Sequence, residues 1–274
     1  SWLLASVQLL PYAKSSILLV LFAWGAGAFV LARVYAAEIR AFWQSHRRVV
    51  LSEEAVFWGL FLLFVLIRCA NGDLWHPSRG GEKPMDFAYL NAVIKSRWFP
   101  PYDPWFAGGY MNYYYFGFVL WGTLIHLTGI IPSVAYNLII PTLFAMTGLG
   151  AFGVVLALIH KKGELIEGRE LRLALLGPAF VGVIGNLGIV KLILSSLASL
   201  GGAGPGSGVA GWDAVAKVAD GLNAYLRGEG SLPVSLEWWY WAPTRAISHP
   251  PSEAGPITEF AWFTFLFGDL HAHA

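Results

Sequence analysis

The strongest constraint on the fold is a long uncharged stretch. From Pro104 to His160 the sequence contains no Asp, Glu, Lys or Arg. A hydrocarbon core about 30 Å thick requires about 20 mainly apolar residues in a helix, because lipid offers no partner to an unpaired backbone amide. The stretch is too long for one such helix, and the turn signal "GIIPS" at Gly129–Ser133 divides it. We therefore expect two membrane spans, near Asn112–Ile131 and at Ser133–Ile159.

Three further apolar runs have the length of a membrane span. Ser15–Ala32 carries no formal charge, and Ala55–Gly72 carries only Arg68, which lies near enough to one end to reach the interface. The third run is Leu171–Ser195, where Pro178 and several glycines predict a bend or close helix packing. The sequence thus predicts an all-α integral membrane protein, a polytopic helical bundle of about five to six spans.

The composition excludes several other classes of protein. Of the residues 56% are hydrophobic and 13% are charged, with a mean hydropathy of +0.56. The charged share is about half of that in a soluble domain. The net charge of +1 provides no basic face for phosphates, so we expect no nucleic acid partner. The single cysteine, Cys69, excludes an internal disulfide and a cysteine zinc cluster.

We interpret residues 1–274 as a single transmembrane domain with two polar insertions. The first is a large loop at 72–112, and the second, at 196–259, includes an amphipathic helix at Trp212–Leu226. The arginines of the loop Arg33–Glu53 favour the cytoplasm, which places the large loop outside, although the basic residues of 160–172 give the opposing signal. The chain starts without Met and stops directly after an apolar run, so we expect a piece of a longer protein.

The large loop opens with the segment "GEKPMDFAYLNAVIKSRWF". Its apolar spacing predicts a helix along the membrane interface, with Pro84 in the first turn. Glu82 and Asp86 are four residues apart and would project the same way, where two close carboxylates suit a general base or a divalent cation. Acidic residues in a first turn are also commonly structural, because they stabilise the helix dipole.

Prolines and aromatic residues dominate the rest of this loop. Asp103 lies within a stiff proline-rich path, and Gly108 permits a sharp turn back to the membrane. Tyr113–Tyr115 could form an interfacial aromatic belt or the wall of a ligand site. Successive helical residues are rotated by about 100°, so we expect at least one of the three to point inward, with Tyr114 the most sensitive to loss of its hydroxyl.

Possible ligands gather at the end of the chain in "GDLHAHA". Asp269, His271 and His273 occupy alternate positions and could hold zinc or manganese, or they could be interfacial residues. Upstream, Arg245 in "WWYWAPTRAISHPP" could bind a phosphate in bidentate fashion or anchor a lipid headgroup.

Two stretches resemble the signatures of a known family. They are "EKPMDFAYLNAVIKSRWFPPYDPWFAGGYMNYYYFGF" and "ITEFAWFTFLFGDLHAHA", which are similar to the uncharacterised "YYY" membrane proteins of Chloroflexi and archaea. That family in turn resembles the glycosyltransferase C (GT-C) superfamily, whose first large extracytoplasmic loop carries an acidic residue and which generally takes sugars from polyprenyl-phosphate carriers. The resemblance implies a GT-C-like fold in a prokaryotic plasma membrane, with Asp86 or Glu82 as the acidic residue. The usual Asp-x-Asp or Glu-Asp doublet is absent.

On this resemblance we expect a glycosyltransferase that acts at the extracytoplasmic face on a polyprenyl-phosphate-linked sugar donor. Asp86 would serve as base or metal ligand, beside Glu82. The expected substrate-binding residues are Lys83, Asp103, Asn112, Tyr114 and Arg245, and the expected ligands of a Mg, Mn or Zn ion are Asp269, His271 and His273. Membrane lipid is the other expected partner.

Two other classes of function compete with this one. They are a transporter or lipid-binding scaffold without catalysis, and a metal-dependent lipid hydrolase that uses the C-terminal cluster. On the leading hypothesis we expect the large loop and the C-terminal motif to form one polar cavity, because each has too few groups alone.

Overall fold

The computed structural model describes residues 1–75, 81–161, 163, 165–184, 187–202, 210–232, 242–244, 247, 256–258 and 260–270. The chain divides into two compact units, Ser1–Pro178 with Thr264–Ala274, and Ala179–Phe263. Within the described residues the named elements are all helices, and one isolated bridge joins Tyr102 to Tyr110. The prediction of an all-helical protein is therefore confirmed.

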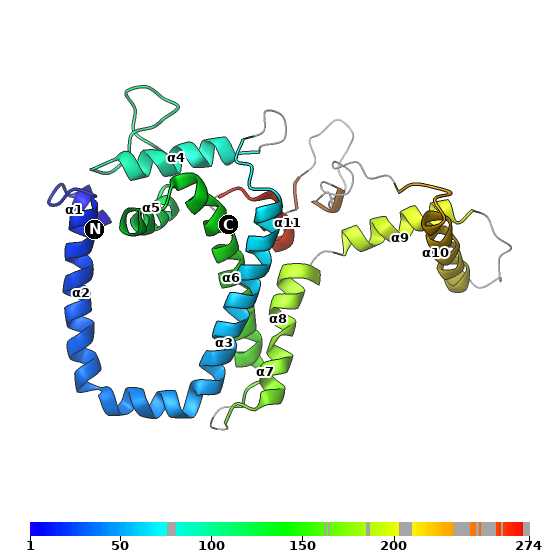
Figure 1. Cartoon of the computed structure of the whole chain (residues 1–274), viewed down its shortest axis with the longest axis horizontal. Coiled ribbons are helices and arrows are strands. Elements are labelled where there is room, and N and C mark those ends of the chain that lie inside the picture. Colours follow the sequence, from blue (N-terminus) through cyan, green and yellow to red (C-terminus); the bar gives the residue numbers. More distant parts are fainter. Residues whose placement is uncertain are drawn as a thin grey trace. The chain divides into compact units, whose positions relative to one another are not determined.

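Three helices of the first unit are long and apolar enough to cross a membrane. They are α2 (Lys14–Val34), α3 (Ala36–Ala70) and α6 (Pro132–Ile159). Their apolar parts coincide with the spans predicted at Ser15–Ala32, Ala55–Gly72 and Ser133–Ile159. Figure 1 shows α2, the second half of α3 and α6 running in the same general direction.

The helix α3 is longer than the sequence suggested, and this corrects the expected loop at Arg33–Glu53. It has 35 residues and begins one residue after α2 ends, with only Tyr35 between them. At about 1.5 Å per residue it measures roughly 52 Å, well beyond a hydrocarbon core of about 30 Å. Figure 1 shows its first part running across from the end of α2 before the rest rises beside α6.

The two other expected spans are not single helices of membrane length. The first corresponds to α5 (Phe116–Thr128), whose 13 residues measure only about 20 Å, and Gly129 ends it at a φ of +72°. The second is divided into α7 (Gly168–Ala174), α8 (Leu176–Ala179), a π-helical turn at Phe180–Ile184 and α9 (Gly188–Leu200). The change from α8 to the π-helical turn follows Pro178 by two residues, near the bend that the sequence predicted.

The core of the first unit lies where α3 packs along α6. The Phe64 and Phe144 ring centroids are 4.5 Å apart, and Phe265 of α11 (Ala261–Phe267) lies edge-on to Phe144 at 5.5 Å. Farther along, Gly148 allows close contact, because a Cβ there would overlap Leu60. The absence of charge in this stretch of α6 therefore serves packing as well as burial in lipid.

At one end of these helices, α4 (Lys83–Lys95) lies against α5 and the start of α6. The segment after α1 (Trp2–Ser6) is fastened to the same end by Tyr12, which is 2% exposed. The Tyr12 hydroxyl donates to the Val119 carbonyl at 2.8 Å, and its backbone N–H donates to the Arg97 carbonyl at 2.7 Å. The helix predicted in the large loop is thus present, and the Tyr12 segment joins Arg97, which lies just beyond it, to α5.

In the second unit, α9 packs closely against α10 (Ala210–Leu226), which matches the helix predicted at Trp212–Leu226. Glycines allow this approach, because a Cβ at Gly201 would overlap the Lys217 carbonyl and one at Gly221 would overlap the Leu197 carbonyl. Trp212 of α10 remains exposed.

Candidate functional site

The inward face of α4 carries the carboxylate that the sequence singled out. Asp86 is fully buried, with 0% of its surface exposed, and Lys83, Tyr89 and Val93 share this face. Glu82 is exposed and precedes the first turn, with backbone angles outside the helical region. The two carboxylates thus differ in exposure. Burial raises the pKa of the Tyr113 phenol, and the charges of both carboxylates add to this shift, which places them near the same side chain.

The start of α4 is joined to the C-terminal motif through Asp269. The Lys83 ammonium lies 3.6 Å from Oδ1 of Asp269 and 4.4 Å from the centroid of the Phe267 ring. The backbone N–H of Glu82 donates to Oδ2 of Asp269 at 3.1 Å. A carboxylate at this position also interacts favourably with the helix dipole. The large loop and the described part of the C-terminal motif thus meet, but the cavity described below is lined neither by Asp269 nor by Asp86, so the expected single polar cavity is not seen in the described residues.

Burial controls the protonation of this pair. It raises the pKa of the Asp269 carboxyl above its usual value, although the Glu82 amide and the Lys83 ammonium act in the opposite direction. Burial likewise lowers the pKa of the Lys83 ammonium, against the attraction of Asp269. In both groups the loss of water outweighs the partner's charge, so the pair is held at an energetic cost.

Two glycines permit this close approach, and the sequence analysis missed both. Gly81 has a φ of +59°, and a Cβ there would overlap the Phe267 ring. Gly268 has a φ of +76°, and a Cβ there would lie 3.0 Å from Nη1 of Arg68. Their left-handed conformations are accessible to glycine at little cost. The motif "FGD" is therefore a turn that places Asp269 against α4.

A second polar group lies at the end of α3. Nε and Nη2 of Arg68 donate to Oδ1 of Asn137 in α6, at 3.0 and 2.5 Å. Nδ2 of Asn137 donates in turn to the carbonyls of Gly72 and Ser133, both at 3.1 Å. Arg68 is 7% exposed, and Asn137 holds its guanidinium at the end of α3. The sequence does contain a signal for this pair: Arg68 is the one charged residue in its predicted span, and Asn137 is the one amide side chain in its own.

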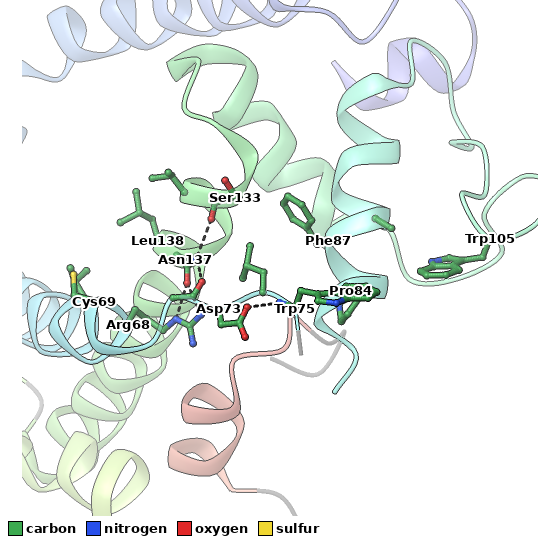
Figure 2. Close-up of a pocket in the computed structure, with 15 residues that line it drawn as sticks. Arg68, Cys69, Asp73, Trp75, Pro84, Phe87, Trp105, Ser133, Asn137 and Leu138 are labelled. Carbon is green, nitrogen blue, oxygen red and sulfur yellow. Dashed lines mark hydrogen bonds between the residues drawn. The ribbon is translucent and has the colours of Figure 1, made fainter. Parts of the chain in front are cut away.

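Arg68 and Asn137 line a cavity of about 1020 Å³. Its walls come from the end of α3, the segment that follows it, α4, the start of α6 and Trp105. Figure 2 shows Arg68 and Asn137 on one wall and Pro84, Phe87 and Trp105 on the α4 side. The lining is mainly apolar and aromatic, with a few polar groups at one end, which is typical of a site for an amphipathic ligand.

Asp103 lies in a short hairpin-like turn. Its backbone N–H donates to the Gly109 carbonyl at 3.0 Å, and its Oδ1 accepts from the Trp105 N–H at 2.8 Å. Burial raises the pKa of the Tyr89 phenol, and the charge of Asp103 adds to this shift. Asp103 therefore positions Trp105 at the cavity and faces the side of α4 that bears Tyr89.

The tyrosine triplet is mostly at the surface. Tyr114 is 72% exposed and Asn112 is also exposed, whereas Tyr115 is half-buried and stacks on Phe99 with ring centroids 5.9 Å apart. Tyr113 packs against Tyr89 at 5.7 Å. The triplet precedes α5, so the helical rotation used to predict an inward tyrosine does not apply to it, but Tyr115 does turn inward. The expected sensitivity of Tyr114 to loss of its hydroxyl stays a prediction.

The expected residues Arg245, His271 and His273 lie outside the described residues. In the part of the chain that the structure describes, no group of three His, Cys, Asp or Glu side chains is arranged to hold a metal ion. Asp269 contacts Lys83 instead.

Comparison with known proteins adds a family but no activity. No curated protein and no solved structure gives a significant match. One family profile, described as "Uncharacterized membrane protein (DUF2298)", matches residues 1–274. Such a match agrees with the three long apolar helices, and membrane lipid is then a contact of this protein. Since the match covers the whole chain, the protein belongs to the DUF2298 family of uncharacterised membrane proteins.

Proposed function

We propose that this protein is a membrane glycosyltransferase of GT-C type that takes a sugar from a polyprenyl-phosphate carrier at the extracytoplasmic face of a prokaryotic plasma membrane. One observation carries the proposal. A large, mainly apolar cavity with an arginine at one end lies beside a helix that bears a fully buried aspartate. The similarity of the two sequence signatures to the "YYY" proteins supports the same class.

The cavity suits the carrier lipid. Its volume of about 1020 Å³ is at the upper end of ordinary ligand sites. Phe87, Trp105 and Leu138 provide apolar surface for isoprenoid units. Arg68 provides a guanidinium, which matches phosphate geometry through paired donors and is always charged. An amphipathic phosphate is the ligand chemistry that these groups fit together.

Asp86 would be the base of the reaction. An acceptor hydroxyl must lose a proton as the anomeric bond breaks, and the departing phosphate requires positive charge. In this division of roles Asp86 takes the proton and Arg68 stabilises the leaving phosphate, with Lys83 the next cation. Because Asp86 has no exposed surface, the proposal requires α4 to move before an acceptor can reach it.

The proposal assigns no step to a divalent cation. Asp269 is held by Lys83 and the Glu82 amide, and its expected partners His271 and His273 lie outside the described residues. The hydrolase alternative depends on the same three residues and gains no support from the arrangement of Asp269.

One observation favours a second candidate, a lipid-binding membrane protein without catalysis. The enclosure of Asp86 is compatible with a purely structural role, while the cavity would still hold a lipid.

Binding and transfer can be measured separately to decide between the two. The purified protein in nanodiscs is incubated with polyprenyl-phosphate-linked hexoses carrying a radiolabelled sugar, with membrane extract of the source cell as acceptor. Movement of label out of the lipid fraction reports transfer, and native mass spectrometry reports lipid binding.

The glycosyltransferase proposal expects Asp86→Asn to abolish transfer and to retain lipid binding, whereas Arg68→Gln should weaken both. Glu82→Gln is the matched control, since Glu82 lies outside the buried face. Binding without transfer by the unchanged protein would favour the second candidate. Failure to bind any polyprenyl phosphate would contradict both.

A further inference from the structure

The first half of α3, residues 36–50, is a helical segment that the protein leaves uncovered. Every residue from 37 to 48 is exposed. The large side chains are included, since Ile39, Phe42 and Trp43 are 51%, 56% and 51% exposed. Helices of globular proteins bury such an apolar face against another element. Another environment must therefore cover this one.

The segment has two distinct sides. Ile39, Phe42 and Trp43 follow the i, i+3, i+4 spacing of one helical face, and Val50 continues it one turn beyond His46. Arg40 and Arg47 flank this face, three residues before and four residues after Trp43, whereas Gln44 and Arg48 lie farther round the helix, and the one acidic residue of the segment is Glu38. An apolar face with Trp and Phe, flanked by arginines, is the pattern of a helix that lies in a membrane interface.

The geometry of the neighbouring helices places this segment at that level. The 21 residues of α2 measure about 32 Å, close to the thickness of a hydrocarbon core, so Tyr35 lies at the membrane boundary. The apolar second half of α3 returns through the same membrane. The 15 residues between measure about 22 Å, which is close to the excess length of α3 over one span. Figure 1 shows them running across between α2 and the rising part of α3.

We propose that residues 36–50 form an interfacial helix that binds anionic phospholipid headgroups, at the membrane face opposite the candidate site. Arg40, Arg47 and Arg48 bind the phosphates, and Ile39, Phe42 and Trp43 enter the acyl boundary. The proposal does not depend on the glycosyltransferase assignment.

Lipid fits this surface better than other anionic partners. A free phosphate would satisfy the arginines but would leave the apolar side exposed. The segment is fixed at the membrane boundary by a span on each side, so lipid is already its neighbour. One ligand with an anionic head and an apolar tail covers both faces.

The depth of each side chain tests the helix orientation. Nitroxide labels are attached to single cysteines, for example Ile39→Cys or Gln44→Cys, in a Cys69→Ser background in nanodiscs. The ratio of collisions with oxygen to collisions with a water-soluble nickel complex should be high at 39, 42 and 43 and low at 41, 44 and 48, because residues on one face of a helix recur every 3 to 4 positions and these two sets lie on opposite faces. A flat or inverted pattern would overturn the proposal.

The lipid preference is tested with a fluorophore on Gln44→Cys, quenched by nitroxide-labelled phosphatidylglycerol or phosphatidylcholine in a phosphatidylcholine nanodisc. We expect stronger quenching by phosphatidylglycerol. A basic residue near an anionic surface strengthens association roughly fivefold, so R40Q/R47Q/R48Q should lower this enrichment by at least that factor. The control K191Q/K217Q/R227Q removes as many exposed cationic groups from the second unit and should leave the enrichment unchanged.

Three results would contradict the assignment to lipid. Equal quenching by the two lipids would leave an acidic protein as the occupant of the arginine face. An unchanged enrichment in R40Q/R47Q/R48Q would show that these arginines do not select lipid. Loss of the preference on adding inorganic phosphate at constant ionic strength would assign the arginines to free anions.

Discussion

Arginine occurs at both ends of α3, and the protein treats it in opposite ways. Arg68 is 7% exposed and donates twice to Asn137, whereas Arg40, Arg47 and Arg48 are exposed along the first half of the helix. A buried guanidinium requires acceptors supplied by the fold, because the protein covers most of its surface. The arginines in the first half of α3 therefore form a surface that interacts with the environment of the protein. Arg68, in contrast, belongs to a site whose hydrogen-bond acceptors come from the protein itself.

The largest effect is expected from removing the Asn137 side chain, which accepts the hydrogen bonds of Arg68. Asn137→Leu removes the Oδ1 that accepts from Nε and Nη2 of Arg68, and we expect a loss of about 2 to 3 kcal/mol, as for hydrogen bonds to buried charged groups. Thermal melting in detergent measures the change, with Arg47→Gln as the comparison. Equal shifts for the two variants would remove the distinction between the ends.

A smaller effect is expected at Gly81, and it tests whether the region around the Asp269 turn is tightly packed. Gly81→Ala places a methyl group against the Phe267 ring at a positive φ. Gly108 also has a positive φ, of +78°, but a Cβ there would meet nothing within 4 Å, so Gly108→Ala is the matched control. The backbone strain of about 1 to 2 kcal/mol is common to both, and overlap adds to it only at Gly81. Indistinguishable melting temperatures would mean that the Asp269 turn is loosely placed.

The pH dependence of stability tests the Asp269 carboxyl at the same end. Burial raises its pKa, so the folded protein retains a proton that the unfolded chain releases. Stability from this group is present below the unfolded pKa and is lost as the pH rises through the folded pKa. Between about pH 4 and pH 7, melting should fall more steeply in the unchanged protein than in Asp269→Asn.

Parallel melting curves for these two proteins would contradict the raised pKa. The range is kept below neutral pH because the lowered pKa of Lys83 acts in the opposite direction at high pH, where stability from that group rises.

The smallest effect is expected for the exposed arginines in the first half of α3. R40Q/R47Q/R48Q should change the melting midpoint in neutral detergent by an amount equivalent to less than about 0.5 kcal/mol, because exposed substitutions away from packed features are usually that small. In anionic lipid the same variant should lose stability relative to the unchanged protein. A large loss in neutral detergent would mean that these arginines have protein partners.

The sequence predicted the features that depend on local chemistry. The apolar spans at Ser15–Ala32 and Ser133–Ile159 follow from the solvent alone, because any backbone in lipid must be helical. The first half of α3 was interpreted as a loop because its arginines lie between two apolar runs, and the helical spacing of Ile39, Phe42 and Trp43 was not considered. Hydropathy distinguishes segments that face lipid from segments that face water. A helix at the boundary between lipid and water contains residues of both kinds, so its hydropathy gives no strong signal for either environment.

The features that the sequence could not supply are contacts between distant residues. Arg68 and Asn137 are each unusual in their own span, but their meeting depends on how α3 packs along α6. The turn at Gly268 gave no sign that it faces Gly81. Tyr114 was favoured over Tyr115 because a triplet does not indicate which member turns inward. Asp86 was singled out by its spacing from Glu82 and by the family resemblance, and neither indicated that its side chain is buried.

The contact between α4 and the C-terminal motif can form only late in synthesis of the chain. Glu82 and Asp269 are separated by 187 positions along the chain. At a synthesis rate of about 5 to 20 residues per second, Lys83 is made roughly 10 to 40 s before its carboxylate partner exists. During that interval the newly inserted α4 carries an ammonium group with no Asp269 to receive it. The contact of Glu82 and Lys83 with Asp269 therefore forms only after Asp269 has left the ribosome.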